Sequence, residues 1–83
     1  MKLLYFAWVR QKTGRGEETV PLPAGCSNLR DLASRLAVRS AGYADAFGDL
    51  RRLRAAINQE HADWDALIGE DDEIAFFPPV TGG

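Results

Sequence analysis

The residues best suited to chemistry lie at the C-terminal end, which reads Pro78-Pro79-Val80-Thr81-Gly82-Gly83. The terminal carboxylate, with an ordinary pKa of about 3.3–3.7, is ionised at neutral pH. Gly82 and Gly83 have no side chain, so this end can enter a channel too narrow for a Cβ atom. The two prolines hold the segment extended, over about 20 Å. We therefore expect a thin, mobile tether that presents a carboxylate to another active site.

The other candidate groups favour structural roles. Cys26 and His61 could act as nucleophile and base, but we expect Cys26 to be a small packed residue and His61 a solvated loop residue. One Cys and one His cannot supply the four ligands of a structural zinc site. Asp71-Asp72-Glu73 could bind a cation through oxygen atoms, yet a solvated turn is favoured. We expect no catalytic set, no metal and no bound cofactor.

Length and composition predict one small domain. The chain has 83 residues, of which 46% are hydrophobic and 27% charged, as in ordinary globular proteins. No apolar run is long enough to cross a membrane, and the N-terminus lacks the features of a signal peptide. The single Cys26 cannot form an internal disulfide, so we expect a cytoplasmic protein.

The charge argues against nucleic acid as a partner, because the formal net charge is −2 and the pI about 5.2. All ten Lys and Arg residues lie within residues 1–54, whereas residues 55–83 hold seven of the twelve acids and no Lys or Arg. This asymmetry indicates either complementarity, within the fold or with a partner, or a solvated acidic loop. For the basic run Arg51, Arg52 and Arg54, a solvated face paired with local acids is favoured over a docking patch.

The first half of the chain predicts a hairpin and a helix. Residues 2–10 predict a strand that is apolar on both faces. Such a strand is either covered on both faces or covered on one and available to a partner, and the second is favoured in so short a chain. Residues 11–16 predict a turn, and residues 17–22 an edge strand. A helix is expected from Ser27 or Asn28, either of which can cap it, to about residue 40. Gly42 is expected to end it.

The second half predicts short elements and two further strands. Residues 43–47 suggest a helical turn, residues 50–58 a half-buried strand, residues 58–65 a polar turn region and residues 73–77 the last strand. This order predicts an α+β domain of the ubiquitin-like β-grasp type, a mixed sheet with one main helix packed on one face. We place the domain at residues 1–77 and a flexible tail at 78–83.

Aromatic residues near the tail predict a partner surface. Adjacent strand residues face opposite sides, so one of Phe76 and Phe77 should be core and the other exposed unless a partner covers it. With Phe6 and Trp8 of the first strand, they predict an apolar patch at the root of the tail, where a partner would dock.

The ending IAFFPPVTGG, Ile74 to Gly83, resembles the C-terminus of the MoaD family, the small subunits of molybdopterin synthase. The segment AAINQE, residues 55–60, is similar to the family's strand leading to an Asn-x-Glu turn. The helix start at residues 26–32 is also similar. The resemblance covers essentially the whole chain, and it is weakest over residues 41–52.

The resemblance implies a cytoplasmic sulfur carrier. In this family an adenylyltransferase related to ubiquitin-activating enzymes uses ATP to adenylate the terminal glycine, here Gly83, and the acyl-adenylate becomes a thiocarboxylate. The tail then docks in the large subunit, in an assembly of two small and two large subunits. Sulfur passes to a cyclic pyranopterin precursor during molybdenum cofactor biosynthesis. Gly82 would be the slim approach residue, and Thr81 stands where a small residue is usual.

Other functions remain open. The same tail chemistry would serve a sulfur carrier for thiamine or another pathway, or a ubiquitin-like modifier that forms isopeptides. A β-grasp interaction module with an inert tail belongs to a different class. The segment Phe-Phe-Pro-Pro, which leads to the Gly-Gly end, favours the molybdopterin pathway. An independent enzyme is disfavoured, because the sequence shows no convincing set of catalytic residues.

Overall fold

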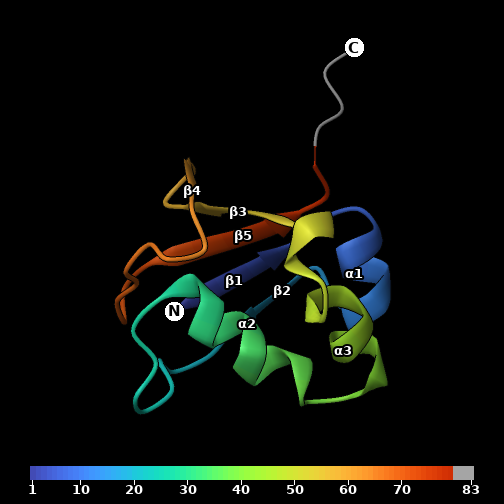
Figure 1. Cartoon of the computed structure of the whole chain (residues 1–83), viewed down its shortest axis with the longest axis horizontal. Helices are drawn as coiled ribbons and strands as arrows, with labels where there is room; N and C mark the ends of the chain where they lie inside the picture. Colours follow the sequence, from blue (N-terminus) through green and yellow to red (C-terminus); the bar gives the residue numbers. More distant parts are fainter. Residues whose placement is uncertain (80–83) are drawn as a thin grey trace.

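The computed structural model describes residues 1–79, which form a mixed five-stranded sheet with helices on one face (Figure 1). The strand order is β2-β1-β5-β3-β4, with β1 and β5 parallel and all other neighbours antiparallel. Among these residues, no helix has the length and apolar character needed to cross a membrane. The elements in chain order are β1 (Lys2–Tyr5), α1 (Trp8–Thr13), β2 (Glu17–Thr19), α2 (Leu29–Ala37), α3 (Ala41–Phe47), the 3-10 helix η1 (Leu50–Arg52), β3 (Arg54–Ile57), β4 (Glu60–Ala62) and β5 (Glu73–Phe77).

The first strand is shorter than predicted, because the chain leaves the sheet after Tyr5 and forms α1. Ala7, with φ 53° and ψ −131°, makes the turn between the two elements. Val9 and Thr13 are buried four residues apart, on the inward side of α1. The prediction of a strand over residues 6–10 was therefore wrong: burial of this helical face overrides the strand preference of Trp8 and Val9. The turn predicted over residues 11–16 begins only at Gly14, which ends α1 with φ 81°.

The predicted helix is confirmed as α2, although it ends at Ala37 and not near residue 40. The side chain of Asn28 caps it by accepting a hydrogen bond from the Asp31 backbone N–H at 2.9 Å. Strand β2 is shorter than predicted and ends at Thr19, before Pro21, which has no N–H to donate. The inward side of α2 is formed by Leu29, Leu32, Ala33 and Leu36.

The prediction that Gly42 ends a helix was wrong, because Gly42 lies within α3, which Ser40 caps. A Cβ atom at Gly42 would overlap the backbone carbonyl oxygen of Lys12 in α1. The absent side chain therefore allows α1 and α3 to pack closely. The helical turn expected over residues 43–47 is confirmed, with Tyr43 and Phe47 both buried.

The strand predicted over residues 50–58 divides into η1 and β3. Asn58 and Gln59 follow with φ 51° and 71°, and this two-residue turn leads into β4, which the sequence did not predict. Strand β4 is short and polar, so it has no alternating apolar pattern to reveal it. Strand β5 has its predicted bounds.

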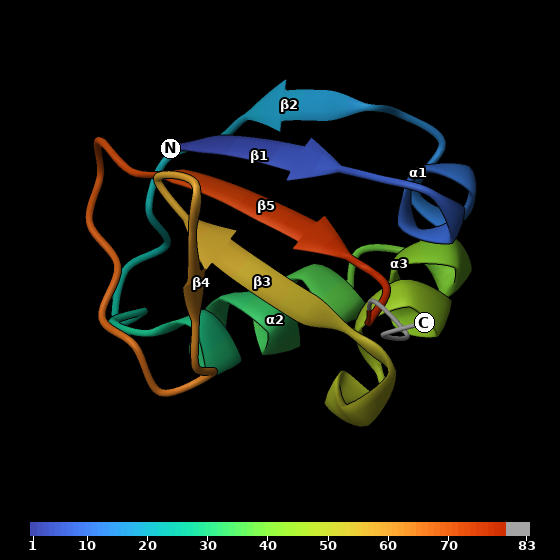
Figure 2. The ribbon, with the colours of Figure 1, turned by 90° about the horizontal axis from the view of Figure 1, so that it is seen from above.

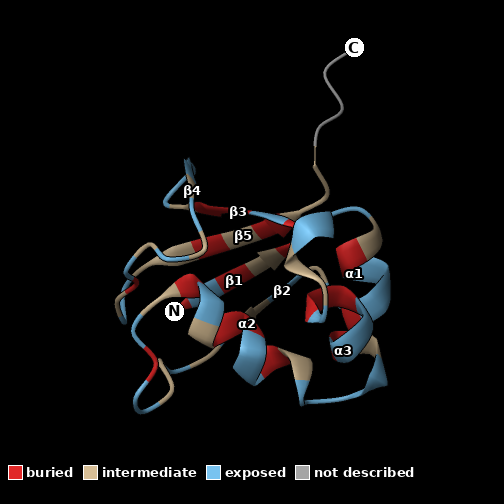
Figure 3. Ribbon diagram, in the orientation of Figure 1, coloured by how far each residue is buried: buried red, intermediate tan, exposed pale blue. Residues whose placement is uncertain are grey.

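The core lies between the sheet and the helices (Figure 3). At its edge, the carboxylate of Glu18 accepts hydrogen bonds from the hydroxyls of Tyr5 at 2.7 Å and Tyr43 at 2.6 Å, and from Arg39 at 3.0 Å. Burial opposes ionisation of Glu18, but these three donors outweigh it and lower the pKa of Glu18 below its usual 4.5. One carboxylate thus joins β2 to β1, α3 and the end of α2.

Candidate functional site

The root of the C-terminal tail is anchored by the central strand of the sheet. Strand β5 pairs with β1 on one side and β3 on the other, and the Phe6 N–H donates to the Phe76 carbonyl at 3.1 Å beyond the end of β1. Phe77 ends β5 opposite Arg54, and Pro78 and Pro79, both half-buried, follow. The root of the tail is therefore held by strand pairing on both edges of β5, which lies between β1 and β3 (Figure 1).

Strand β5 ends at Phe77, and the domain boundary predicted after this residue stays a prediction. Pro78 and Pro79 interrupt backbone pairing there, as expected for residues without an N–H. Val80, Thr81, Gly82 and Gly83 lie outside the described residues. Their predicted roles, and the flexibility predicted for residues 78–83, stay predictions.

One face of the sheet carries no helix over it in the part of the chain that the structure describes (Figure 2). Because side chains alternate along a strand, Ile74 and Phe76 point into the core while Ala75 and Phe77 point to the other side. The strand register places further residues on that side. We call this surface the open face; its apolar strand residues are Leu4, Ala56, Ala75 and Phe77. The exposed Phe6 follows directly after β1.

The structure corrects one of the four predicted interface residues. Phe76 is fully buried, between Tyr5 and Phe47, so it cannot contact a partner while the core is intact. Phe77 is half-buried on the open face, with its ring 5.3 Å from that of His61. Phe6 is 49% exposed, and Trp8 is half-buried in α1. The predicted apolar patch is thereby reduced to Phe6, Trp8 and Phe77, and its role in docking stays a prediction.

Two arginines stand beside the tail root without a carboxylate partner among residues 1–79. Arg52 places its guanidinium 5.2 Å from the centre of the Trp8 ring. Arg54 donates only to backbone carbonyls, at 2.8 Å to Leu53 and 3.3 Å to Arg51. The expected pairing with local acids holds for Arg51, which binds Asp49 at 3.0 Å. Arg54 therefore adds a positive charge to the rim of the open face, although the sequence favoured pairing with local acids for the whole run Arg51, Arg52 and Arg54.

Several acids of residues 60–73 serve the fold itself. Asp65 pairs with Arg30 at 3.1 Å, and Glu70 accepts from the Leu22 N–H at 2.9 Å. Asp72 accepts from the Gly69 N–H at 2.7 Å and from Asn58 at 2.9 Å. The charge asymmetry is therefore partly resolved by complementarity within the fold.

Cys26 and His61 have structural surroundings. Cys26 is buried before α2, and burial followed by the charge of Asp31 raises the pKa of its thiol. Its place in the buried core confirms the expected packing role. His61 is exposed on β4, a strand rather than the predicted loop. Within residues 1–79, no three His, Cys, Asp or Glu residues gather in a metal-binding arrangement.

Comparison with known proteins gives consistent results across the chain. Residues 3–83 match the ThiS family. The molybdopterin synthase sulfur carrier subunit of Escherichia coli (strain K12) is 37% identical over 83 residues, covering 100% of this chain and 99% of the relative. The human protein of the same name is 31% identical over 86 residues, covering 100% and 93%.

Solved structures support the fold. A putative molybdopterin converting factor, subunit 1, from Pyrococcus furiosus superimposes with a TM-score of 0.76 at 31% identity, over 95% of both chains. The modifier protein SAMP1 from Haloferax volcanii gives a TM-score of 0.76 at 26% identity, over 100% of this chain and 98% of its own. The predicted β-grasp fold is confirmed.

Proposed function

The chain belongs to the ThiS family, and we propose that it is the sulfur carrier subunit of a molybdopterin synthase, acting in molybdenum cofactor biosynthesis. The observation that carries this function is the whole-length likeness to sulfur carrier subunits, 37% identical over 99% of the Escherichia coli protein. The structure supports it: β5 is held on both edges and delivers the chain at Phe77 into Pro78-Pro79 and the Gly-Gly end.

The proposed chemistry takes place at the carboxyl carbon of Gly83. A carboxylate is a poor electrophile, so a separate adenylyltransferase first joins it to AMP from ATP and releases pyrophosphate. A sulfur nucleophile then attacks the carbonyl carbon, the bond to AMP breaks, and a thiocarboxylate remains. That sulfur is nucleophilic at neutral pH and forms a bond to a carbon of the cyclic pyranopterin precursor. Water then cleaves the bond between the sulfur and the Gly83 carbonyl carbon, which leaves the sulfur on the precursor and restores the Gly83 carboxylate. No bound cofactor and no acid or base of this chain is needed, because the partners supply activation and the acceptor.

We propose that the open face docks on the large subunit of the synthase. A carrier subunit works with other subunits, and the half-exposed Phe6 and half-buried Phe77 supply an apolar centre beside the tail root. Arg54 supplies a charged rim without an internal carboxylate partner within residues 1–79. An assembly of two small and two large subunits in the cytoplasm is part of this proposal.

A second candidate is a protein modifier. Its support is the structural likeness to SAMP1, whose name describes a modifier protein. In that function the activated Gly83 would form an isopeptide with a lysine instead of a thiocarboxylate. A sulfur carrier for thiamine synthesis would load sulfur in the same way, and turnover of the pyranopterin precursor separates it from the first proposal.

Intact mass spectrometry after incubation with ATP, a sulfur source and the activating enzyme tests the function. We expect a mass gain equal to the exchange of one oxygen for one sulfur, located at Gly83 and dependent on ATP. Isopeptide-linked adducts in place of this product would support the modifier. An unchanged Gly83 beside an activating enzyme that loads another carrier would contradict both and leave the interaction module as the better account.

Arg54→Glu is expected to weaken binding to the large subunit roughly tenfold, because a rim charge that meets an acidic partner becomes repulsive. The measurement is calorimetric titration at two salt concentrations, where the loss should shrink at high salt. Arg30→Glu, the same charge change on α2 at the other face of the sheet, is the control and should bind normally. Equal affinities for the Arg54 variant and the unmodified chain would remove Arg54 from the interface.

A further inference from the structure

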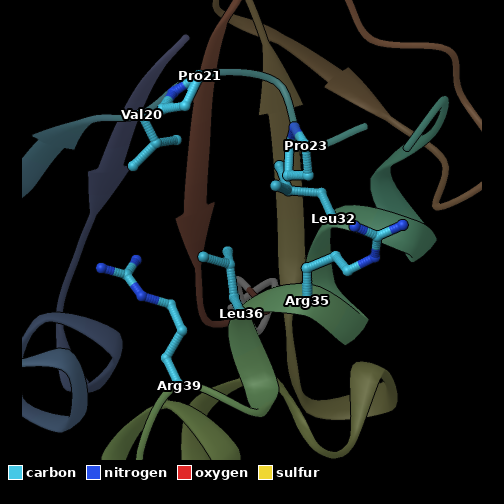
Figure 4. A pocket seen from close by; sticks show the side chains of 7 residues that line it. All are labelled: Val20, Pro21, Pro23, Leu32, Arg35, Leu36 and Arg39. Atoms are coloured by element: carbon cyan, nitrogen blue, oxygen red, sulfur yellow. The ribbon is translucent and has the colours of Figure 1, made fainter. Parts of the chain in front are cut away.

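A groove runs along α2 on the side of the sheet opposite the open face (Figure 4). It encloses about 290 Å³ between α2 and residues 20–23, the segment that continues β2. Its walls are apolar, and two arginines stand beside it: Arg35 of α2, and Arg39, which lies just beyond the end of that helix. The apolar walls are formed by Val20, Pro21, Pro23, Leu32 and Leu36.

The adjoining strand β2 offers backbone groups that have no partner among residues 1–79. Strand β2 is the outermost strand of the sheet on this side. Met1 and Val20 exchange two hydrogen bonds, 2.8 Å from the amino terminus to the Val20 carbonyl and 2.9 Å in return. In an antiparallel pair such residues alternate with residues whose backbone groups point away, so Thr19 and Glu17 present their N–H and C=O groups outward. An exposed edge of this kind can accept one more strand.

The charges at the groove select the ligand. Arg35 donates to the Ala24 carbonyl at 3.0 Å and, among residues 1–79, has no carboxylate partner. Arg39 is held by Glu18 at 3.0 Å and lies 4.5 Å from the centre of the Tyr43 ring, so its position is fixed. Arg35 therefore leaves an uncompensated positive charge beside apolar walls, which favours a ligand that is both apolar and anionic.

We propose that this groove and the edge of β2 bind an extended acidic segment of a partner protein. The segment's backbone pairs with Glu17 and Thr19, its alternating apolar side chains enter the groove, and a carboxylate meets Arg35. A peptide fits better than a small acid, because only a peptide uses the backbone edge and the groove together. This surface lies apart from the tail root, so the proposal does not depend on sulfur transfer.

A pair of fluorescein-labelled peptides tests the proposal: a valine–isoleucine core flanked by glutamates, and the same core flanked by lysines. We expect the acidic peptide to bind at least roughly tenfold more tightly, a difference of about 1.4 kcal/mol. On the isotope-labelled protein, amide shifts should gather at Thr19, Val20 and Arg35 and spare Phe77. Arg35→Glu should remove the preference for glutamate, whereas Arg54→Glu, the same change beside the open face, should keep it.

Thr19→Pro adds an independent check on the backbone. It deletes an outward N–H that does not pair with β1, so the fold should remain while peptide affinity falls. Equal binding of the two peptides, shifts at the open face, or no binding would each overturn the proposal. The same shifts on raising the protein concentration without peptide would also overturn it, and would assign the groove to a second copy of the chain. Should Thr19→Pro fail to fold, the Arg35 and Arg54 variants still decide the outcome.

Discussion

Adding one alanine after Gly83 is expected to lower the rate of sulfur loading by more than about 100-fold, because misplacing a reacting atom by about 1 Å can already cost that much. The extra residue moves the carboxyl group by roughly 3.3–3.6 Å along an extended chain. It also places a Cβ atom where the native end has none. The measurement is the fraction of thiocarboxylate formed with time, by intact mass spectrometry with the activating enzyme and ATP.

The matched control for this extension is Thr81→Ala, which changes the tail but keeps the Gly-Gly end. It should load at close to the normal rate, because alanine has a smaller side chain than threonine and so makes the tail beside the Gly-Gly end slimmer. Both variants should unfold at the same temperature as the unmodified chain, since the core ends at Phe76. Normal loading of the extended chain would contradict the assignment of Gly83 as the carrier residue. This result would not affect the proposal that the groove beside α2 binds a peptide.

Glu18→Ala is expected to have the largest effect on folding. It leaves the hydroxyls of Tyr5 and Tyr43 without their acceptor and Arg39 without its anion. Hydrogen bonds to a charged group contribute about 1.5–3 kcal/mol each and are not additive, so we expect a loss of about 2–4 kcal/mol in the free energy of unfolding. For a domain of this size, that lowers Tm by roughly 10–25 °C. Denaturant and thermal unfolding measure both quantities.

Glu17→Ala is the control, on the same strand with its side chain 65% exposed and paired only with Lys2. It should change the free energy of unfolding by less than about 0.5 kcal/mol. Similar losses in both variants would show that removing any acid from β2 is costly and that the buried network contributes nothing.

The Glu18 network also predicts how stability depends on pH. The pKa of Glu18 is lowered in the folded chain, so its contribution is present above pH 4.5 and is lost as the pH falls through the folded value. The gap in stability between the unmodified chain and Glu18→Ala should therefore close in acid. Burial, followed by Glu18, raises the pKa of Tyr5 and of Tyr43, the two tyrosines of the chain. In Glu18→Ala, tyrosinate absorbance should appear at lower pH.

The sequence predicted correctly the elements that local signals define, and it missed those that depend on contacts between residues far apart in the chain. Helix α2 and strand β5 were predicted correctly because their apolar spacing and caps are local signals. The helix at residues 8–13 was missed because its burial depends on the core around Val9, which no local pattern reveals. Strand β4 was missed because a short polar edge strand is defined by its pairing with β3.

The candidate site also has parts that the sequence predicted and parts that only the structure revealed. The tail, with its prolines and terminal glycines, was recognised from the sequence because its chemistry needs no neighbouring residue of the chain. The choice between Phe76 and Phe77 required the sheet, because alternation alone cannot say which face the helices cover. The free charges of Arg54 and Arg35 also required the structure, because it shows which arginines the nearby acids bind within residues 1–79. Asp49 pairs with Arg51, and Glu18 pairs with Arg39.

Local periodicity, capping and composition were enough to predict the β-grasp order of elements, the main helix and the Gly-Gly end. The point where β1 stops, the need for glycine at position 42 and the surfaces left for partners follow only from the folded chain. The physical reason is that packing joins residues far apart in the chain: the Lys12 carbonyl excludes a side chain at Gly42, and α2 and β2 together create a groove that neither forms alone.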